Sequence, residues 1–313
     1  DSALRWSLRR QMKDRDGSVP VAAVSLIAMG RYGGREVNFS SDADVIAVYR
    51  PNEGVDDLEA NRFAKAVIDD LRGVVSGPTT VEPKIDLDMD LRPEGKNGPL
   101  IRSFDSCREY YAMWSSVWEH QALLRARYAA GDEELAHDFL TQIADPIRYP
   151  RSEISQSQIG EIRRLKARME VERLPRGVRR DRHLKLGKGG LSDVEWTVQL
   201  MQLQHAGMHD ELHTTQTIPA LHALEQLGLI DAEDADILEQ GWRACTGARN
   251  GNYLWSGRAA QADILPDDSY SLGGIAVYLG HPAHWGQQFE NRMLLLMRRC
   301  REVMDRLFYD TQD

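Results

Sequence analysis

The most informative stretch of this sequence reads MGRYGGREVNFSSDAD, at residues 29–44. An apolar run at 21–28 precedes it, and a β-like run at 45–49 follows it. Short apolar runs of this kind are typical of buried strands, so the stretch is expected to connect two neighbouring strands. Its three glycines let the backbone approach an anion closely and direct N–H groups toward it. We interpret this turn as a phosphate cradle.

Two aspartates, Asp42 and Asp44, open the second of these strands. Residues two apart on a strand point to the same side, so the two carboxylates are expected to project together. Such a pair repels unless a cation lies between its members. Carboxylate oxygens suit Mg²⁺ or Mn²⁺, which complete their shells with water and substrate phosphates. Each motif alone is more often an ordinary turn or a solvated strand start, but together they indicate nucleotidyl transfer.

A third carboxylate is expected, because two metal ions need more ligands than one pair supplies. Residues 84–91 read KIDLDMDL, and this strict alternation predicts a strand with apolar side chains on one face. Asp86, Asp88 and Asp90 would then share the other face. The alternative is a solvent-facing edge strand whose charges discourage aggregation.

Six sequence blocks together resemble the glutamine synthetase adenylyltransferase family. The blocks are the stretch from Gly30 to Tyr49, DMDLRPEG at 88–95, GPL at 98–100, WEHQAL at 118–123, RAR at 125–127 and KLGKGGLSDVEW at 185–196. The resemblance covers nearly the whole chain. It implies an α+β fold, with a polymerase-β-like nucleotidyltransferase domain (a mixed sheet with helices) followed by an all-α helical bundle. One departure is Arg31, where family members often have lysine.

The resemblance also implies a function. Family enzymes carry two related halves: one transfers AMP from ATP to a tyrosine of glutamine synthetase, and the other removes it by phosphorolysis. This regulates nitrogen assimilation. The chain is long enough for one half, and its WEHQAL block resembles the C-terminal, adenylylating half more closely. The expected cofactor is Mg²⁺ or Mn²⁺, ATP is the substrate, and glutamine synthetase is the partner. A PII signal protein is a further expected partner of the full-length enzyme.

Site residues follow from the resemblance position by position. The catalytic and metal-binding set is Asp42, Asp44 and Asp88, with Asp88 also placed to take the phenol proton. The expected ATP-binding set is Gly30, Gly33, Gly34, Ser41, Arg92, Lys185, Gly189 and Gly190. Two of these assignments have purely structural alternatives. Arg92 would equally pair with the acids beside it, and residues 185–195 would equally be a helix start capped by Ser192.

The chain is expected to form two domains, a nucleotidyltransferase domain with trailing helices at 1–150 and a helical bundle at 151–313. Helices are predicted at 57–71, 106–129, 157–172, 191–205, 218–227, 232–250 and 282–308. Strand patterns nearly vanish after residue 104. The aromatic residues Tyr110, Tyr111, Trp114 and Trp118 are expected to be core anchors, and breaks are expected at Asp145-Pro146 and Tyr149-Pro150.

Composition limits the remaining function classes. The net charge of −9 argues against a nucleic-acid partner. Three cysteines without paired spacing indicate reduced, packed thiols and a cytoplasmic location. No apolar run approaches the ~20 residues of a membrane span. A non-catalytic nucleotide-binding module, a PII uridylyltransferase and an antibiotic-modifying nucleotidyltransferase remain as alternatives, and the block at 185–195 argues against the last two.

Overall fold

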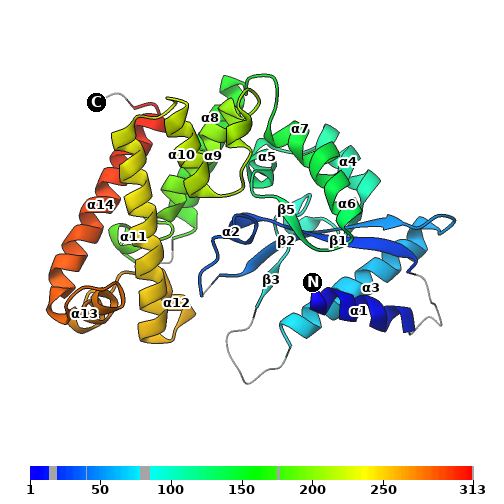
Figure 1. The fold of residues 1–313 in the computed structure, drawn as a ribbon, viewed down its shortest axis with the longest axis horizontal. Helices are drawn as coiled ribbons and strands as arrows, with labels where there is room; N and C mark the ends of the chain where they lie inside the picture. The colour runs from blue at the N-terminus through cyan, green and yellow to red at the C-terminus, as the bar shows by residue number, and fades with distance from the viewer. Residues whose placement is uncertain (14–19, 40, 78–84, 175–176, 312–313) are drawn as a thin grey trace. The chain divides into compact units, whose positions relative to one another are not determined.

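A computed structural model describes residues 1–13, 20–39, 41–77, 85–174 and 177–311 (Figure 1). The chain divides into two compact units, and neither is one continuous stretch. Unit 1 contains Asp1–Val37, Ser41–Arg151 and Thr214–Gln216, and unit 2 contains Asn38–Ser40, Ser152–His213 and Thr217–Asp313. Within the described residues, no helix combines the length and the apolar character needed to cross a membrane.

Unit 1 is built on a mixed five-stranded sheet. Its strands are β1 (Ala22–Ala28), β2 (Ala43–Pro51), β3 (Leu87–Asp88), β4 (Arg102–Ser103) and β5 (Arg127–Gly131). The order is β3-β2-β1-β5, and β4 also pairs with β2. β1 runs antiparallel to β2 and β5, whereas β3 and β4 run parallel to β2. The two strands predicted around the glycine turn are therefore confirmed, and the α+β class with a mixed sheet is correct.

Helices cover both faces of this sheet (Figure 1). Along β2, Val45, Ala47 and Tyr49 pack with α1 (Ser2–Lys13) and α3 (Asp57–Val75). The alternate residues Ile46 and Val48 pack on the opposite face, in a cluster supplied by α4 (Phe104–Met113), α6 (Glu133–Asp138) and the π-helical turn η2 (Phe139–Ala144). This alternation is the two-residue period of a strand buried on both faces.

The predicted single helix at 106–129 is wrong. The segment forms α4, then α5 (Val117–Leu123), then β5. A capping box between Ser116 and Glu119 starts a new helix, because the two groups satisfy each other's backbone N–H donors. Residues from Arg127 onward then pair with the edge of β1. Trp114, expected in the core, is 72% exposed at the end of α4.

The break expected at Asp145-Pro146 is also absent. Pro146 lies in the first turn of α7 (Asp145–Arg148), which continues directly from η2. The three cysteines are buried, as expected, and none forms a disulfide. Burial raises the pKa of Cys107 and of Cys300 to about 12, so both remain thiols.

Unit 2 is helical apart from one isolated bridge, among the residues that the structure describes. Its helices are α8 (Gln156–Glu172), η3 (Arg180–Arg182), α9 (Leu191–His205), η4 (Asp210–Leu212), α10 (Thr217–Gln226), α11 (Ala232–Ser256), α12 (Ala259–Ala262), α13 (Ser269–Tyr278), η5 (Ala283–Trp285) and α14 (Gly286–Leu307). The helices predicted at 157–172, 191–205, 218–227, 232–250 and 282–308 correspond to α8, α9, α10, α11 and α14. Helix α13 was not predicted.

A buried ion network ties α8, α9 and α14 together. Lys166, 2% exposed, contacts the Asp193 carboxylate at 2.5 Å and Glu170 at 2.8 Å. Arg301 from α14 contacts Glu170 at 2.8 Å and Asp193 at 3.2 Å. Asp193 is completely buried, so its charge depends on these partners for compensation.

Replacing Asp193 by alanine is expected to destabilise unit 2 by about 3–5 kcal/mol, since the buried Lys166 would keep only Glu170, which it shares with Arg301. The measurement is urea denaturation followed by tryptophan fluorescence. Asp181→Ala is the control, because Asp181 forms an exposed pair with Arg179. Equal urea midpoints for the two variants would contradict the structural role of the network.

Candidate active site

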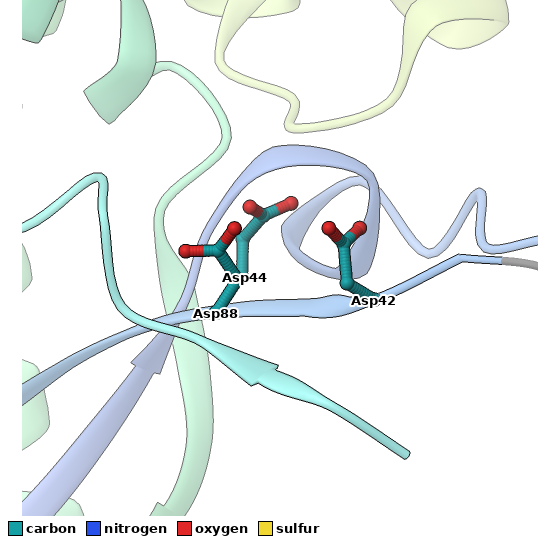
Figure 2. Close-up of side chains that lie close together, drawn as sticks. All are labelled: Asp42, Asp44 and Asp88. Atoms are coloured by element: carbon teal, nitrogen blue, oxygen red, sulfur yellow. The ribbon is translucent and has the colours of Figure 1, made fainter. Parts of the chain in front are cut away.

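Three carboxylates meet at the end of the β2–β3 pair. One carboxylate oxygen each from Asp42, Asp44 and Asp88 lies within 4.8 Å of the other two. Figure 2 shows the three side chains projecting from the same side of the strands. Asp44 and Asp88 are direct partners in the parallel register, and Asp42 comes just before β2. The predicted Asp-x-Asp pair and its third acid are therefore brought together.

This cluster has the chemistry of a divalent metal site. All of its ligand atoms are carboxylate oxygens, the type that Mg²⁺ and Mn²⁺ prefer. Asp42 is exposed, while Asp44 and Asp88 are half-buried. A bound ion would thus keep coordination positions open for water and for a substrate. Without an ion the three like charges repel, which makes the arrangement unfavourable as a purely structural feature.

The strand predicted at 84–91 is much shorter in the structure. β3 contains only Leu87 and Asp88, and Lys84 lies outside the described residues. The Asp90 backbone N–H donates to Oδ1 of Asp88 at 2.7 Å, which turns the chain out of the strand. The Asp90 carboxylate instead contacts Lys96 at 3.1 Å. The expected row of three aspartates on one strand face is therefore wrong, and Asp88 alone joins the cluster.

The glycine turn contributes space rather than a row of open N–H groups. Residues Gly30–Gly33 form the short helix α2, in which Gly33 donates to the Met29 carbonyl and Gly34 to the Gly30 carbonyl. Gly30 has φ +50°, and a Cβ added there would lie 2.2 Å from Oδ2 of Asp44. Glycine is required at this position because the Asp44 carboxylate occupies the volume that a side chain would fill.

Two arginines hold the turn, and sequence reasoning gave neither a role. Arg125 contacts Glu36 at 2.9 Å and donates to the Thr215 carbonyl at 2.6 Å. Both partners of this ion pair are buried. Arg127 donates to the carbonyls of Gly33 at 2.9 Å and Tyr32 at 2.7 Å. The RAR block at 125–127 entered the sequence analysis only through the family resemblance. Two closely spaced arginines next to an apolar helix could have indicated that they bind a neighbouring turn.

Gly33 and Gly34 fit closely against Arg125. A Cβ on Gly33 would lie 1.9 Å from the Arg125 carbonyl oxygen, and one on Gly34 would lie 2.5 Å from the Arg125 guanidinium. Their lack of a side chain is therefore explained by packing. Ser41 is half-buried directly before Asp42. The ATP-binding roles given to these residues stay predictions.

Arg92 is already engaged within its own loop. Its guanidinium donates to the carbonyls of Met89 at 2.8 Å, Gly98 at 3.2 Å and Lys96 at 3.2 Å. It also lies 3.6 Å from the Asp90 carboxylate. The structure thus favours the alternative in which this arginine pairs with a neighbouring acid, and contact with a phosphate stays a prediction.

The remaining predicted residues, Lys185, Gly189 and Gly190, belong to unit 2. Gly189 has φ +72°, and a Cβ there would lie 1.6 Å from the backbone oxygen of Met297 in α14. Its N–H donates to Asp193 at 2.7 Å. The glycine therefore permits close packing of the loop on α14. The alternative interpretation, a helix start capped by Ser192, is not what the structure shows, because Gly190 is the N-cap of α9 and Asp193 accepts the Gly189 N–H.

The fold and the cluster together define an α+β protein with a candidate metal centre, in which carboxylates come from two neighbouring strands. The chain is 65% identical over 99% of its length to the bifunctional glutamine synthetase adenylyltransferase/adenylyl-removing enzyme of Bifidobacterium longum strain DJO10A. Relatives with the same description occur in Streptomyces avermitilis at 46% identity and Mycobacterium avium at 44%, each over 98% of the chain. The chain is similar to part of these enzymes, since it spans 29%, 30% and 31% of the three relatives.

Two family models match separate parts of the chain. Residues 1–142 match glutamate-ammonia ligase adenylyltransferase, and residues 161–308 match GlnD PII-uridylyltransferase. The second match includes residues 185–195. This block therefore does not argue against a PII uridylyltransferase, contrary to the sequence analysis, because the match to that family includes it.

Replacing Gly30 by alanine is expected to weaken Mn²⁺ binding about 10- to 100-fold, the loss typical when a group that orients a metal ligand is changed. The new methyl group would displace the Asp44 carboxylate. Gly54→Ala is the matched control, because Gly54 also has a positive φ but no atom within 4 Å of the added Cβ. Both variants carry a backbone penalty of about 1–2 kcal/mol. Electron paramagnetic resonance of free Mn²⁺ measures the affinity, and equal affinities would contradict this reading.

Proposed function

We propose that this chain transfers AMP from ATP to a tyrosine of glutamine synthetase and releases pyrophosphate. The observation that carries the proposal is the three-carboxylate cluster of Asp42, Asp44 and Asp88 in a chain 65% identical to part of a relative with that description. The relatives' description names both an adenylyltransferase and an adenylyl-removing enzyme. We assign the adenylylating reaction on the WEHQAL block at 118–123, and its correspondence to the C-terminal half stays a prediction.

In this proposal, unit 1 is a polymerase-β-like nucleotidyltransferase domain, near residues 1–150. Its mixed sheet, with a helical turn between β1 and β2 and the acids at the start of β2, supports that assignment. Residues 151–313 are the helical bundle domain. Its helices supply no part of the carboxylate cluster.

The three aspartates would hold Mg²⁺ or Mn²⁺, which neutralises charge on the attacking and leaving oxygens of a phosphoryl transfer. The phenol oxygen of the target tyrosine attacks the α-phosphorus of ATP in line with the bond to pyrophosphate. One O–P bond forms and one breaks, and the Asp88 carboxylate accepts the phenol proton. Asp90 orients that carboxylate by donating its N–H to Oδ1.

Two other reactions have specific support. Phosphorolysis would use the same groups: phosphate attacks the phosphorus of the AMP–tyrosine linkage, the bond to the tyrosine oxygen breaks, ADP forms and the phenol is protonated. The relatives' description includes this removing activity. Uridylyl transfer to a PII signal protein is the second alternative, and the match of residues 161–308 favours it. A PII protein would be the substrate of a uridylyl transfer, whereas it would be a regulator of an enzyme that modifies glutamine synthetase.

Replacing Asp88 by asparagine is expected to lower the transfer rate by about 10²–10⁴-fold for loss of the general base, with loss of a metal ligand adding to it. Asp86→Asn and Asp90→Asn are the controls, since neither carboxylate belongs to the cluster. Single-turnover rates at saturating Mg²⁺ make the comparison. Equal losses in all three variants would contradict the role of Asp88.

The direction is tested with radiolabelled nucleotide. Incubation with Mg²⁺, α-labelled ATP and unmodified glutamine synthetase is expected to place label on the protein substrate. Parallel reactions contain AMP-modified glutamine synthetase with phosphate, or UTP with a PII protein. Release of labelled ADP alone would transfer the function to the removing reaction, and labelling of PII from UTP alone would transfer it to the uridylyl reaction.

A further inference from the structure

The loop at residues 88–98 begins at Asp88 and is held by hydrogen bonds among its own residues. Asp90 donates its N–H to Asp88, and Arg92 crosses the loop to reach the carbonyls of Met89 and Gly98. At its tip, Glu94 adopts φ +64°, a left-handed conformation that is unusual for a residue with a side chain. Such a conformation persists only where the surroundings hold it.

Residues from α4 and α5 hold this tip. The Glu94 backbone N–H donates to the Tyr110 hydroxyl at 3.2 Å. That hydroxyl in turn donates to the Glu119 carboxylate, 3.0 and 3.1 Å from its two oxygens. Glu119 also accepts the N–H of Ser116 at 2.8 Å. The hydrogen-bond chain therefore runs from the Asp88 loop to the first turn of α5.

A second contact holds the side chain of Glu94. Its carboxylate forms an ion pair with Arg102, whose guanidinium lies 5.3 Å from the centre of the Tyr110 ring. Arg102 also donates to the Ser106 hydroxyl at 3.1 Å. Tyr110 of α4 thus holds the backbone of Glu94, and Arg102 of β4 holds its side chain.

The buried end of the chain is suited to act as an anchor. Glu119 is 2% exposed, and burial raises the pKa of its carboxyl group. Burial likewise raises the pKa of Tyr110, so the phenol keeps its proton and remains a donor. Hydrogen bonds of this kind are strengthened by low exposure, and their loss would leave the Glu119 oxygens without one of their donors.

We propose that Tyr110 and Glu119 are positioning residues for Asp88, which hold the 88–98 loop through Glu94 and so set the orientation of the third carboxylate. Neither residue touches the cluster itself. The inference rests on the proposed function, in which Asp88 binds metal and takes a proton. It adds a group of residues outside the metal site on which the site's affinity and rate depend.

The test compares Tyr110→Phe with Tyr128→Phe. Both lose one tyrosine hydroxyl in unit 1, and Tyr128 donates instead to the Gly131 carbonyl at 3.1 Å, in β5. Mn²⁺ affinity is measured by electron paramagnetic resonance, without any substrate. Tyr110→Phe is expected to bind Mn²⁺ about tenfold more weakly, as for the loss of an outer-shell partner of a metal ligand. In the AMP-transfer assay its kcat should fall by a similar factor with little change in KM for ATP.

Two further variants support the comparison. Glu119→Gln keeps an oxygen that can accept from Tyr110 and Ser116, so it is expected to retain more Mn²⁺ affinity than Glu119→Ala. Glu94→Gln removes the charge paired with Arg102 and keeps the backbone N–H that donates to Tyr110, so it tests the ion pair separately. The comparison of Glu119→Ala with Glu119→Gln decides the question if Tyr110→Phe does not fold: equal Mn²⁺ affinities in these two variants would overturn the positioning role.

The outcomes separate this inference from the proposed function. Equal Mn²⁺ affinities for Tyr110→Phe and Tyr128→Phe, with both folded, would overturn the positioning role even if AMP transfer is observed. Weaker Mn²⁺ binding by Tyr110→Phe alone would uphold that role, even if wild-type protein fails to modify glutamine synthetase. In that case only the proposed acceptor and reaction would be lost.

Discussion

The parallel register of β2 and β3 pairs Asp44 with Asp88, and this forces two carboxylates together at the edge of the sheet. Their repulsion has to be overcome by the rest of unit 1. The β2–β3 ladder is only two residue pairs long, whereas β1 and β2 pair over seven. The long ladder and its two apolar faces therefore hold β2 in place, and β2 presents the acids. A metal ion would relieve the remaining repulsion, so binding and folding are expected to be linked.

This constraint explains the glycine turn better than a phosphate cradle alone does. Gly30 leaves room for the Asp44 carboxylate, while Gly33 and Gly34 leave room for Arg125. The buried pair of Arg125 with Glu36 then fixes the chain that follows the turn. A buried arginine satisfied by a carboxylate and a carbonyl is costly to disrupt, so the turn has little freedom to change shape. Rigidity of this kind suits a site whose ligands must meet within a few ångströms.

The sequence was sufficient where the signal is local. The apolar runs on either side of residues 29–44 predicted β1 and β2, and the two-residue period of a strand predicted that Asp42 and Asp44 project together. Prediction failed where partners distant in the chain decide the structure. The segment that forms β5 has no alternating pattern, and it becomes a strand because the edge of β1 is open to it. Helix α13 contains Gly273 and Gly274, which weaken any helical pattern but allow close contacts with residues of η5 and α11.

Gly189 is a second position where a contact distant in the chain made the sequence-based prediction fail. A glycine-rich loop between lysines predicts an anion site, but the backbone of Met297 occupies the space beside this glycine. Only the folded bundle reveals that contact, because Met297 lies more than a hundred residues further along the chain. Replacing Gly189 by valine is therefore expected to disrupt the packing of unit 2. A Cβ 1.6 Å from a backbone oxygen cannot be accommodated by a side-chain movement.

The two family matches concern different parts of the chain, the first mainly unit 1 and the second unit 2. Unit 1 carries the carboxylate cluster, and the metal chemistry proposed for it would be the same for adenylyl and uridylyl transfer. Residues 161–308 resemble enzymes described by a different nucleotide and a different acceptor. A shared bundle cannot by itself distinguish two acceptors. In the proposed function, the choice between glutamine synthetase and a PII protein must therefore depend on surface residues that differ between the families, while the buried network around Asp193 serves the common framework.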